Sequence, residues 1–448
     1  MVAISRIFRS GLASAFAAIG ALLSLTTSAY AVPSYAAQTG QPCSSCHVGG
    51  FGPQLTPFGR EFKLGAYSMR AGKATVPLSV MAIASYLRTH EPQSGLPGNF
   101  HSNDNVALDE VGLFLAGGGK HVGGFIQGTY DGVEKGWAWD NVDLRTAWPT
   151  TIAGANAVIG ASLNNSPTTQ DVWNSLAAWG YPYTDSGLAP GPSTALFIND
   201  AWGQNVLGMT AYTWINSQFY LEGGGYRSLG ANAINKLGGD AADTSKINGV
   251  APYFRVAYQK NFGQQNFEIG AFGLFSHVFP GRDQSVGATD RVSDIGADMS
   301  WQYFAANKDV FSANARYTHE RQSLDASTIL ALASNSRNTL DEFRFEGSYY
   351  WRNKVGATIG YFNLSGNADP MLYAFSRTFS PDSSGVTFQI DGTLFGDHAG
   401  PLGQRFNIRV GVQYAKYFKV DGSKNDFDGA GTNASADNTL RIFMWGAY

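Results

Sequence analysis

The chain has 448 residues, of which 44% are hydrophobic, 13% aromatic and only 15% charged, and it carries 54 glycines. Soluble domains average about 25% charged residues and about 7% glycine, so this chain is poor in charge and rich in glycine. A net charge of −3 excludes the basic face that nucleic acid requires, and the aromatic content excludes intrinsic disorder. A mean hydropathy of −0.15 excludes a bundle of membrane helices, and two cysteines are too few for a disulfide scaffold.

Residues 1–31 have the pattern of an export signal. Two arginines precede an apolar run at 11–25, and an A-x-A triplet at 29–31 matches a cleavage site. The apolar run is about 15 residues, shorter than the roughly 20 that a spanning helix needs, although an uncleaved anchor is the alternative. We therefore expect the mature chain to begin near Val32 and to function outside the cytoplasm.

The only two cysteines lie in one short motif, Cys43-Ser44-Ser45-Cys46-His47. C-x-x-C-H is the attachment signal of c-type haem, since thiols at this spacing reach two vinyl groups of one haem and the histidine comes under the iron. We therefore assign Cys43 and Cys46 to covalent attachment and His47 to axial ligation. A thioredoxin-like redox pair would need a βαβ context, which does not surround the motif. A zinc site would need two further ligands nearby. A plain disulfide between the two cysteines is the alternative that stays open.

A second axial ligand is not fixed by the motif. The candidates nearest in sequence are two methionines and three histidines: Met69, Met81, His90, His101 and His121. Met69 is preferred because it lies inside the expected haem module, and an open or water-ligated position is the alternative.

Beyond residue 77, apolar and polar residues alternate up to the last residue, as in 342–351, 386–394 and 405–415. One face is apolar with aromatics near its ends, and the other carries Arg, Glu, Gln and small residues. A soluble sandwich would need a second sheet to bury the apolar faces, whereas a transmembrane β-barrel turns them to lipid. We therefore expect an all-β, antiparallel outer-membrane barrel.

The spacing of the alternating segments predicts the number of strands. Candidate strands lie at about 78–88, 106–116, 121–131, 138–147, 151–163, 195–203, 205–215, 218–227, 250–260, 266–277, 292–302, 309–319, 340–351, 354–363, 385–395, 405–418 and 438–447. Assigning 195–203 to the long loop after 163, or to an extension of the next strand, leaves an even number, sixteen. These strands are joined by alternating long and short connections, as in bacterial outer-membrane barrels. The short connections then lie on the same side as the C-terminus, in the periplasm. The last nine residues, ending in Tyr448, resemble the assembly signal of Gram-negative outer-membrane proteins.

The segment after the cysteine motif carries a family resemblance. Cys43, Cys46 and His47 are followed by the run Phe58-Gly59-Arg60-Glu61-Phe62-Lys63-Leu64, by Tyr67 and by a barrel of suitable length. In these features the sequence resembles the fused monohaem cytochrome–porin family of bacterial outer membranes, whose best-known members are iron(II) oxidases. The resemblance implies one covalent haem c and an electron-transfer role. By its residues alone, 58–64 reads as a short amphipathic helix with Phe58, Phe62 and Leu64 against the haem and Arg60 or Lys63 near a propionate.

The sequence thus predicts a signal peptide at 1–31, a monohaem cytochrome c module at 32–77 and a porin-like barrel at 78–448. A sixteen-stranded barrel leaves a lumen of roughly 11 Å radius, and a 46-residue module has a radius of gyration near 9 Å, so we expect the module to plug the lumen or its periplasmic mouth. Inward charges would then meet its polar groups: Arg255, Arg316, Arg344, Arg405, Arg409, Glu268, Glu342 and Glu346.

Two functions from different classes follow. The first is an outer-membrane conduit that moves single electrons between an extracellular donor, ferrous iron being one candidate, and a periplasmic carrier such as a soluble cytochrome. Its other partner is outer-membrane lipid, it needs no nucleic acid, and no side chain is assigned as catalytic. The alternative is a passive porin or transporter with an N-terminal plug and a disulfide between the cysteines.

Overall fold

The structure is a computed structural model and describes residues 34–71, 77–175, 184–199, 202–242, 244–403 and 405–448. The predicted signal peptide at 1–31 lies outside these residues. Within the described part of the chain, none of the helices is long and apolar enough to cross a membrane.

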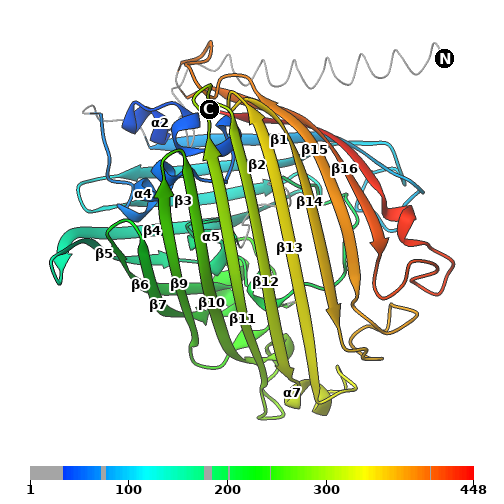
Figure 1. The fold of residues 1–448 in the computed structure, drawn as a ribbon. Coiled ribbons are helices and arrows are strands. Elements are labelled where there is room, and N and C mark those ends of the chain that lie inside the picture. The colour runs from blue at the N-terminus through cyan, green and yellow to red at the C-terminus, as the bar shows by residue number, and fades with distance from the viewer. Residues whose placement is uncertain (1–33, 72–76, 176–183, 200–201, 243, 404) are drawn as a thin grey trace, which may run out of the picture.

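One antiparallel sheet makes up most of the molecule and closes on itself where β1 pairs with β17 (Figure 1). Its strands are β1 Leu78–Thr89, β2 Asn105–Gly118, β3 Val122–Asp131, β4 Gly136–Ile152, β5 Ala155–Asn164, β6 Val206–Ile215, β7 Phe219–Ser228, β8 Lys246–Ile247, β9 Ala251–Phe262, β10 Gln265–Phe279, β11 Asp290–Phe304, β12 Val310–Ser323, β13 Arg337–Trp351, β14 Val355–Gly366, β15 Ser383–Thr393, β16 Asn407–Lys419 and β17 Thr439–Ala447. Because β8 is two residues within the connection between β7 and β9, the described barrel wall has sixteen strands. The predicted number is confirmed, and 195–203 lies in a long loop that holds the 3-10 helix η2, Phe197–Asn199.

The outer surface of the barrel is apolar. Along β15, Phe388 and Ile390 are 47% and 66% exposed, while Gln389 and Asp391, which alternate with them, are buried. The same alternation runs along β13 and β14, where Phe343, Phe345 and Ile359 face outward. A closed sheet has no unpaired strand edge, so all backbone N–H and C=O groups of its strands can form hydrogen bonds between strands. A barrel with this apolar exterior is therefore suited to lipid.

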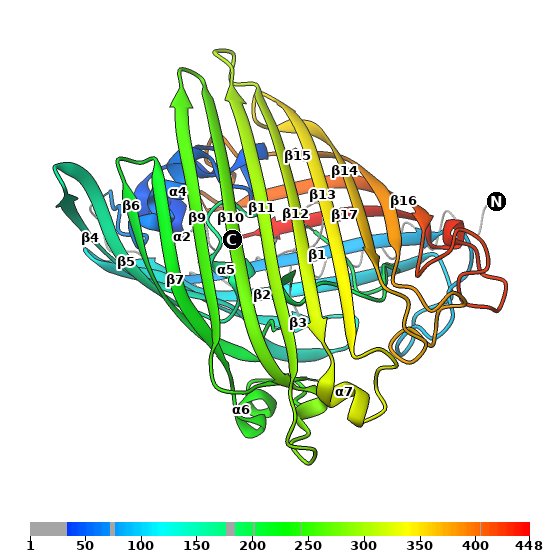
Figure 2. The same ribbon diagram turned by 60° about the horizontal axis from the view of Figure 1, so that its bottom comes forward.

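The two ends of the barrel differ in their connections (Figure 2). Turns at 153–154, 216–218, 263–264 and 352–354 close one end, which also holds the C-terminus and is called the turn end here. Long connections at the opposite end, the loop end, contain α6 (Ala231–Lys236), α7 (Asp325–Ile329), η3 (Pro280–Arg282) and η4 (Ala434–Asp437). The alternation has two departures: 132–135 is short at the loop end, and 394–406 is longer at the turn end. Outer-membrane barrels place their short turns in the periplasm.

Residues 34–71, called the N-terminal segment here, lie against the inner wall at the turn end (Figures 1 and 2). The segment contains α2 (Ser34–Thr39), α3 (Cys43–Cys46), η1 (Val48–Gly50) and α4 (Pro57–Leu64). Helix α4 begins where its sequence predicts, because the Thr56 hydroxyl accepts a hydrogen bond from Gly59 N at 3.2 Å and a proline occupies the first turn. The segment thus consists of short helices that pack against the barrel wall.

Candidate cofactor site

Part of the inner wall at the turn end of the barrel is apolar. We call this region the apolar patch, and it consists of inward side chains from β1, β2, β3 and β17: Met81, Ile83, Phe114, Phe125, Phe443 and Trp445. Further along β17, the inward position is Arg441, which pairs with Asp109 at 2.8 Å. Barrel lumens are ordinarily polar, so the patch marks a place where the wall contacts something other than water.

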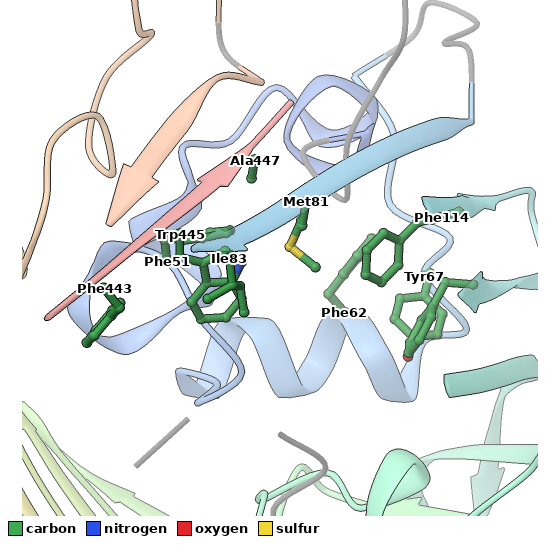
Figure 3. Close-up of a cluster of buried hydrophobic side chains, with 11 residues drawn as sticks. Phe51, Phe62, Tyr67, Met81, Ile83, Phe114, Phe443, Trp445 and Ala447 are labelled. Atoms are coloured by element: carbon green, nitrogen blue, oxygen red, sulfur yellow. The ribbon is translucent and has the colours of Figure 1, made fainter. Parts of the chain in front are cut away.

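Between the apolar patch and the N-terminal segment lies a cavity that we call the apolar cavity. It encloses about 1120 Å³ of empty space, part of it open to solvent. Its lining includes Cys43, Cys46 and His47 on one side and Met81, Phe114, Phe125 and Trp445 on the other. Figure 3 shows Met81 of the patch pointing from β1 toward α4. The structure therefore brings the three predicted site residues together at one cavity.

The C-x-x-C-H motif is held by hydrogen bonds from its own backbone and from the wall. Helix α3 is a single turn, closed by a bond from His47 N to Cys43 O at 2.9 Å, and the two thiols are not joined to each other. On the barrel side, the Asn353 amide donates to the carbonyls of Ser44 and His47 at 3.3 and 3.1 Å. Thr393 Oγ1 donates to Gly49 O at 2.7 Å. The motif is thereby fixed relative to the turn between β13 and β14.

Burial sets the protonation of the motif residues. It lowers the pKa of His47 to about 4, so the imidazole is neutral at neutral pH, and the Nδ1 atom is buried without a hydrogen-bond partner. It raises the pKa of Cys46 to about 12, and that of Cys43 in the same direction, so both are thiols rather than thiolates. Redox-active cysteine pairs have lowered pKa values, so this environment disfavours the thioredoxin-like interpretation. A neutral buried imidazole, in contrast, is suited to bind a metal ion.

Helix α4 packs directly on the cysteine motif. A Cβ atom added at Gly59 would lie 2.4 Å from Cys46 O, so only glycine permits this approach. Of the three apolar residues predicted to face the cofactor, Phe62 lines the cavity, whereas Leu64 packs on Trp173 and Tyr212 and Phe58 does not line it. The helix therefore presents a narrower face to the cavity than the sequence predicts.

The two predicted cationic residues of α4 have different surroundings. Arg60 is buried against β10 and β11, where it donates to Asn266 and Gln302, and it does not line the cavity. Lys63 does line it and donates to the carbonyls of Thr169 and Asp171 at 2.8 and 3.1 Å. Burial lowers the pKa of Lys63 to about 8, against the raising effect of the Asp143 carboxylate 3.6 Å away.

Two charged residues of the site are absent from the sequence-based prediction. Asp143 accepts a hydrogen bond from Tyr67 Oη at 2.7 Å and pairs with Arg145 at 2.8 Å, and both charges are buried. They occupy inward positions two residues apart on β4. The signal that could have found them is the period-2 pattern of 138–147, which sets both on the same polar face as the other lumen residues.

The connection between β5 and β6 is described at 165–175, 184–199 and 202–205. These parts lie inside the barrel and are called the lumen loop. Its helix α5 (Pro167–Gln170) is buried, and Trp173 donates to Gln259 Oε1 at 3.0 Å and stacks edge-on against Tyr220. Asn174 Nδ2 donates to Pro53 O of the N-terminal segment. The loop therefore packs on both the wall and the segment, a role that the sequence does not predict.

The predicted inward charges do face the interior, but most contact one another or the lumen loop. Arg255 pairs with Asp298 at 2.6 Å and with Asp171 of the lumen loop at 3.4 Å. Arg316 donates to Ser175 O at 3.0 Å and pairs with Glu342. Arg409 is the arginine of this set that donates to the N-terminal segment, at Phe51 O with a distance of 2.5 Å. The expectation that all of these inward charged residues contact polar groups of the N-terminal segment is therefore wrong.

A second, polar cavity lies beyond the lumen loop. It encloses about 1680 Å³ of empty space that is partly open to solvent, and its lining includes Arg316, Arg344, Glu346 and Gln413. Asn174 lines both this cavity and the apolar one. The two spaces are thus neighbours on either side of one residue.

The five candidates for a second axial ligand occupy distinct places. Met69, preferred from the sequence, is 41% exposed and does not line the apolar cavity. His90 and His101 lie in the first connection at the loop end, and His121 lies in the turn between β2 and β3, where it stacks on Trp148. Met81 is the candidate that lines the cavity.

Comparisons with known proteins concern the barrel. No protein-family model and no curated protein matches the sequence. Among solved structures, the chain is similar to OmpT, an outer membrane protein of Vibrio cholerae, with 10% identity and a TM-score of 0.45 over 84% of this chain and 99% of that one. It is also similar to the anion-selective porin from Comamonas acidovorans, with 12% identity and a TM-score of 0.46 over 84% of this chain and 100% of that one. A third similar structure is the outer membrane channel DcaP of Acinetobacter baumannii, with 13% identity and a TM-score of 0.43 over 83% of this chain and 96% of that one.

The chain's own closed sheet and apolar exterior define its class. It is a sixteen-stranded, porin-like β-barrel of the bacterial outer membrane, with lipid against its outward apolar residues.

Proposed function

We propose that this protein is an outer-membrane electron conduit in which Cys43, Cys46 and His47 hold one covalent haem c in the apolar cavity. The observation that carries the proposal is the cavity itself. A C-x-x-C-H motif, an apolar patch on the inner wall and a neutral histidine with a buried Nδ1 atom all meet there. The haem, when bound, supplies a one-electron couple that neither thiols nor aromatic side chains provide.

The residues around the cavity fit this group. The Nδ1 atom of the His47 imidazole is buried without a hydrogen-bond partner, and a neutral imidazole is a common metal ligand. Phe62, Phe114 and Trp445 supply apolar contacts for a macrocycle. Lys63, protonated below about pH 8 and lining the same cavity, offers a cation to an acidic substituent.

We interpret the segments inside the lumen as an arrangement for transfer of electrons rather than for passage of solutes. The N-terminal segment lies against the inner wall at the turn end, and the lumen loop packs on it through Lys63 and Asn174. A small donor that entered the polar cavity from the loop end would be separated from the apolar cavity by Asn174. The segment's exposed face at the turn end lies toward the periplasm, where a soluble carrier would accept the electron.

Haem staining of the denatured chain tests the proposal. The protein is expressed with a c-type cytochrome maturation system, purified from outer membranes and separated under denaturing conditions. We expect haem to stay with the wild-type chain and with S44A, and to be lost from a C43S/C46S double variant. A wild-type chain without covalent haem would refute the proposal.

The identity of the donor needs a second measurement. We expect ferrous iron to reduce the purified haem protein, recorded as sharpening of its visible absorption bands, because the fused cytochrome–porins that the sequence resembles include iron(II) oxidases. If dithionite reduces the haem and ferrous iron does not, the donor is a different reductant and the conduit remains.

A passive porin or transporter is the second candidate, and the polar cavity with its lining arginines and glutamates favours it. Conductance in planar bilayers separates the two. A conduit with a filled lumen should be nearly closed, and removal of 34–71 behind the export signal should raise its conductance. Full conductance of the intact, haem-free chain would favour the porin.

A further inference from the structure

We propose that Met81 of β1 is the second axial ligand of the haem iron, so that the iron is held by His47 from the N-terminal segment and by a thioether from the barrel wall. This inference rests on the proposed function.

Met81 is placed by the register of the barrel. It lies opposite Gly112 of β2 and Ala447 of β17, and its side chain faces inward with 7% exposure. It lines the apolar cavity together with Cys43, Cys46 and His47. In Figure 3 its side chain extends from β1 toward α4, with its sulfur among the aromatic residues of the patch. His47 and Met81 therefore reach the same cavity from the segment and from the wall.

The other lining side chains that bind iron in proteins are already engaged or in an unsuitable state. Lys63 donates to two carbonyls of the lumen loop, and Tyr67 donates to Asp143. The Tyr35 hydroxyl has no hydrogen-bond partner, but a tyrosine binds iron as a phenolate, and burial raises the pKa of Tyr35 well above its usual range. The Met81 sulfur needs no deprotonation and no release from another contact.

The chemistry of the pair also suits the site. A neutral thioether can be buried without an unpaired charge, and sulfur packs well against aromatic rings, such as those of Phe114 and Phe62 in the same cluster. Methionine with histidine is an axial pair found in cytochromes c, and it raises the reduction potential of the haem. The iron would then link the N-terminal segment to β1 across the cavity.

The experiment uses the full-length haem protein and the variants M81L, M81H and M69L. Wild type and M69L should show the weak long-wavelength absorption band of thioether-ligated ferric haem, and their reduced forms should not bind carbon monoxide. The M81L variant, which keeps the volume, should lose the band and bind carbon monoxide. The M81H variant should regain six-coordination and have a lower reduction potential. A tight, heat-modifiable band on electrophoresis verifies that each barrel is folded.

A measurement on the wild-type protein guards against variants that fail to fold. With methionine methyl groups labelled with carbon-13, one of the chain's seven methionines should show a strongly upfield methyl signal in the reduced protein, and M69L should retain it. The inference is overturned if M81L keeps the wild-type spectrum, if wild-type haem binds carbon monoxide at once, or if Y35F rather than M81L changes the ligation. A chain without covalent haem would instead refute the proposed function, so the two failures are distinguishable.

Discussion

Lys63 shows what a single buried charge does at the contact between the N-terminal segment and the lumen loop. Its ammonium group donates to Thr169 O and Asp171 O, yet burial lowers its pKa from 10.5 to about 8. Between these two pH values the unfolded chain binds more protons than the folded one, so the free energy of unfolding rises with pH. At neutral pH, Lys63 is charged in both the folded and the unfolded chain, so burying the charge lowers the free energy of unfolding by its full amount.

A pH series on K63M tests this linkage. The stability of wild type relative to K63M should increase as pH rises from about 8 to 10.5, by up to about 3 kcal/mol. Urea unfolding of the detergent-folded proteins, followed by tryptophan fluorescence at several pH values, gives the difference. A difference that is constant with pH would mean that Lys63 keeps its ordinary pKa.

Gly59 makes a second prediction for one residue. In G59A the new Cβ would meet the Cys46 carbonyl at 2.4 Å, so α4 must move away from α3 at a cost of roughly 1–3 kcal/mol. We expect less haem per chain and a lower thermal midpoint. G223A in β7, where a Cβ meets nothing within 4 Å, should change neither quantity. Equal haem content in both variants would contradict the close packing of α3 and α4.

Among the elements, the lumen loop is held in place mainly by one aromatic residue. Trp173 anchors it by its bond to Gln259, by edge contacts with Trp214 and Tyr220, and by the Arg255 guanidinium 5.0 Å from its ring. The loop thereby separates the polar cavity from the apolar one. Its irregular backbone is tolerated at this depth because it lies inside the barrel and not against lipid.

The W173A variant should release this element. Loss of a buried tryptophan costs about 3–5 kcal/mol, and the loosened loop should raise single-channel conductance. W148A serves as the control, since Trp148 is an exposed aromatic on the outer face of β4. We expect no change of conductance for W148A, and the same result for W173A would mean that another element closes the lumen.

At the scale of the whole molecule, the apolar exterior fixes how the barrel sits in the membrane. An arginine near the bilayer midplane costs about 2–4 kcal/mol, and one near the interface about 0–1 kcal/mol. Phe388 lies in the middle of β15, and Leu394 directly follows the strand at the turn end. The F388R variant should therefore lose much more free energy of unfolding in lipid bilayers than L394R. Equal losses would contradict this position of the membrane.

The sequence by itself determined the barrel. Side chains of a strand alternate with a period of two whatever the tertiary contacts, so the outward Phe388 and Ile390 and the inward Gln389 and Asp391 could be assigned from residue types alone. The even strand number followed from spacing, whereas the spacing left 195–203 either in a loop or as an extension of the next strand. The proximity of Cys43, Cys46 and His47 is likewise local, because one helical turn brings them together.

Only the tertiary structure decided what faces these residues. The apolar patch joins positions from β1 and β17, which are distant in sequence and adjacent only because the sheet closes. For this reason the sequence favoured Met69, which is near the motif along the chain, over Met81, which is near it in space. The inward fold of the lumen loop and the partners of Asp143 and Arg409 also depend on contacts between distant segments, which no local pattern encodes.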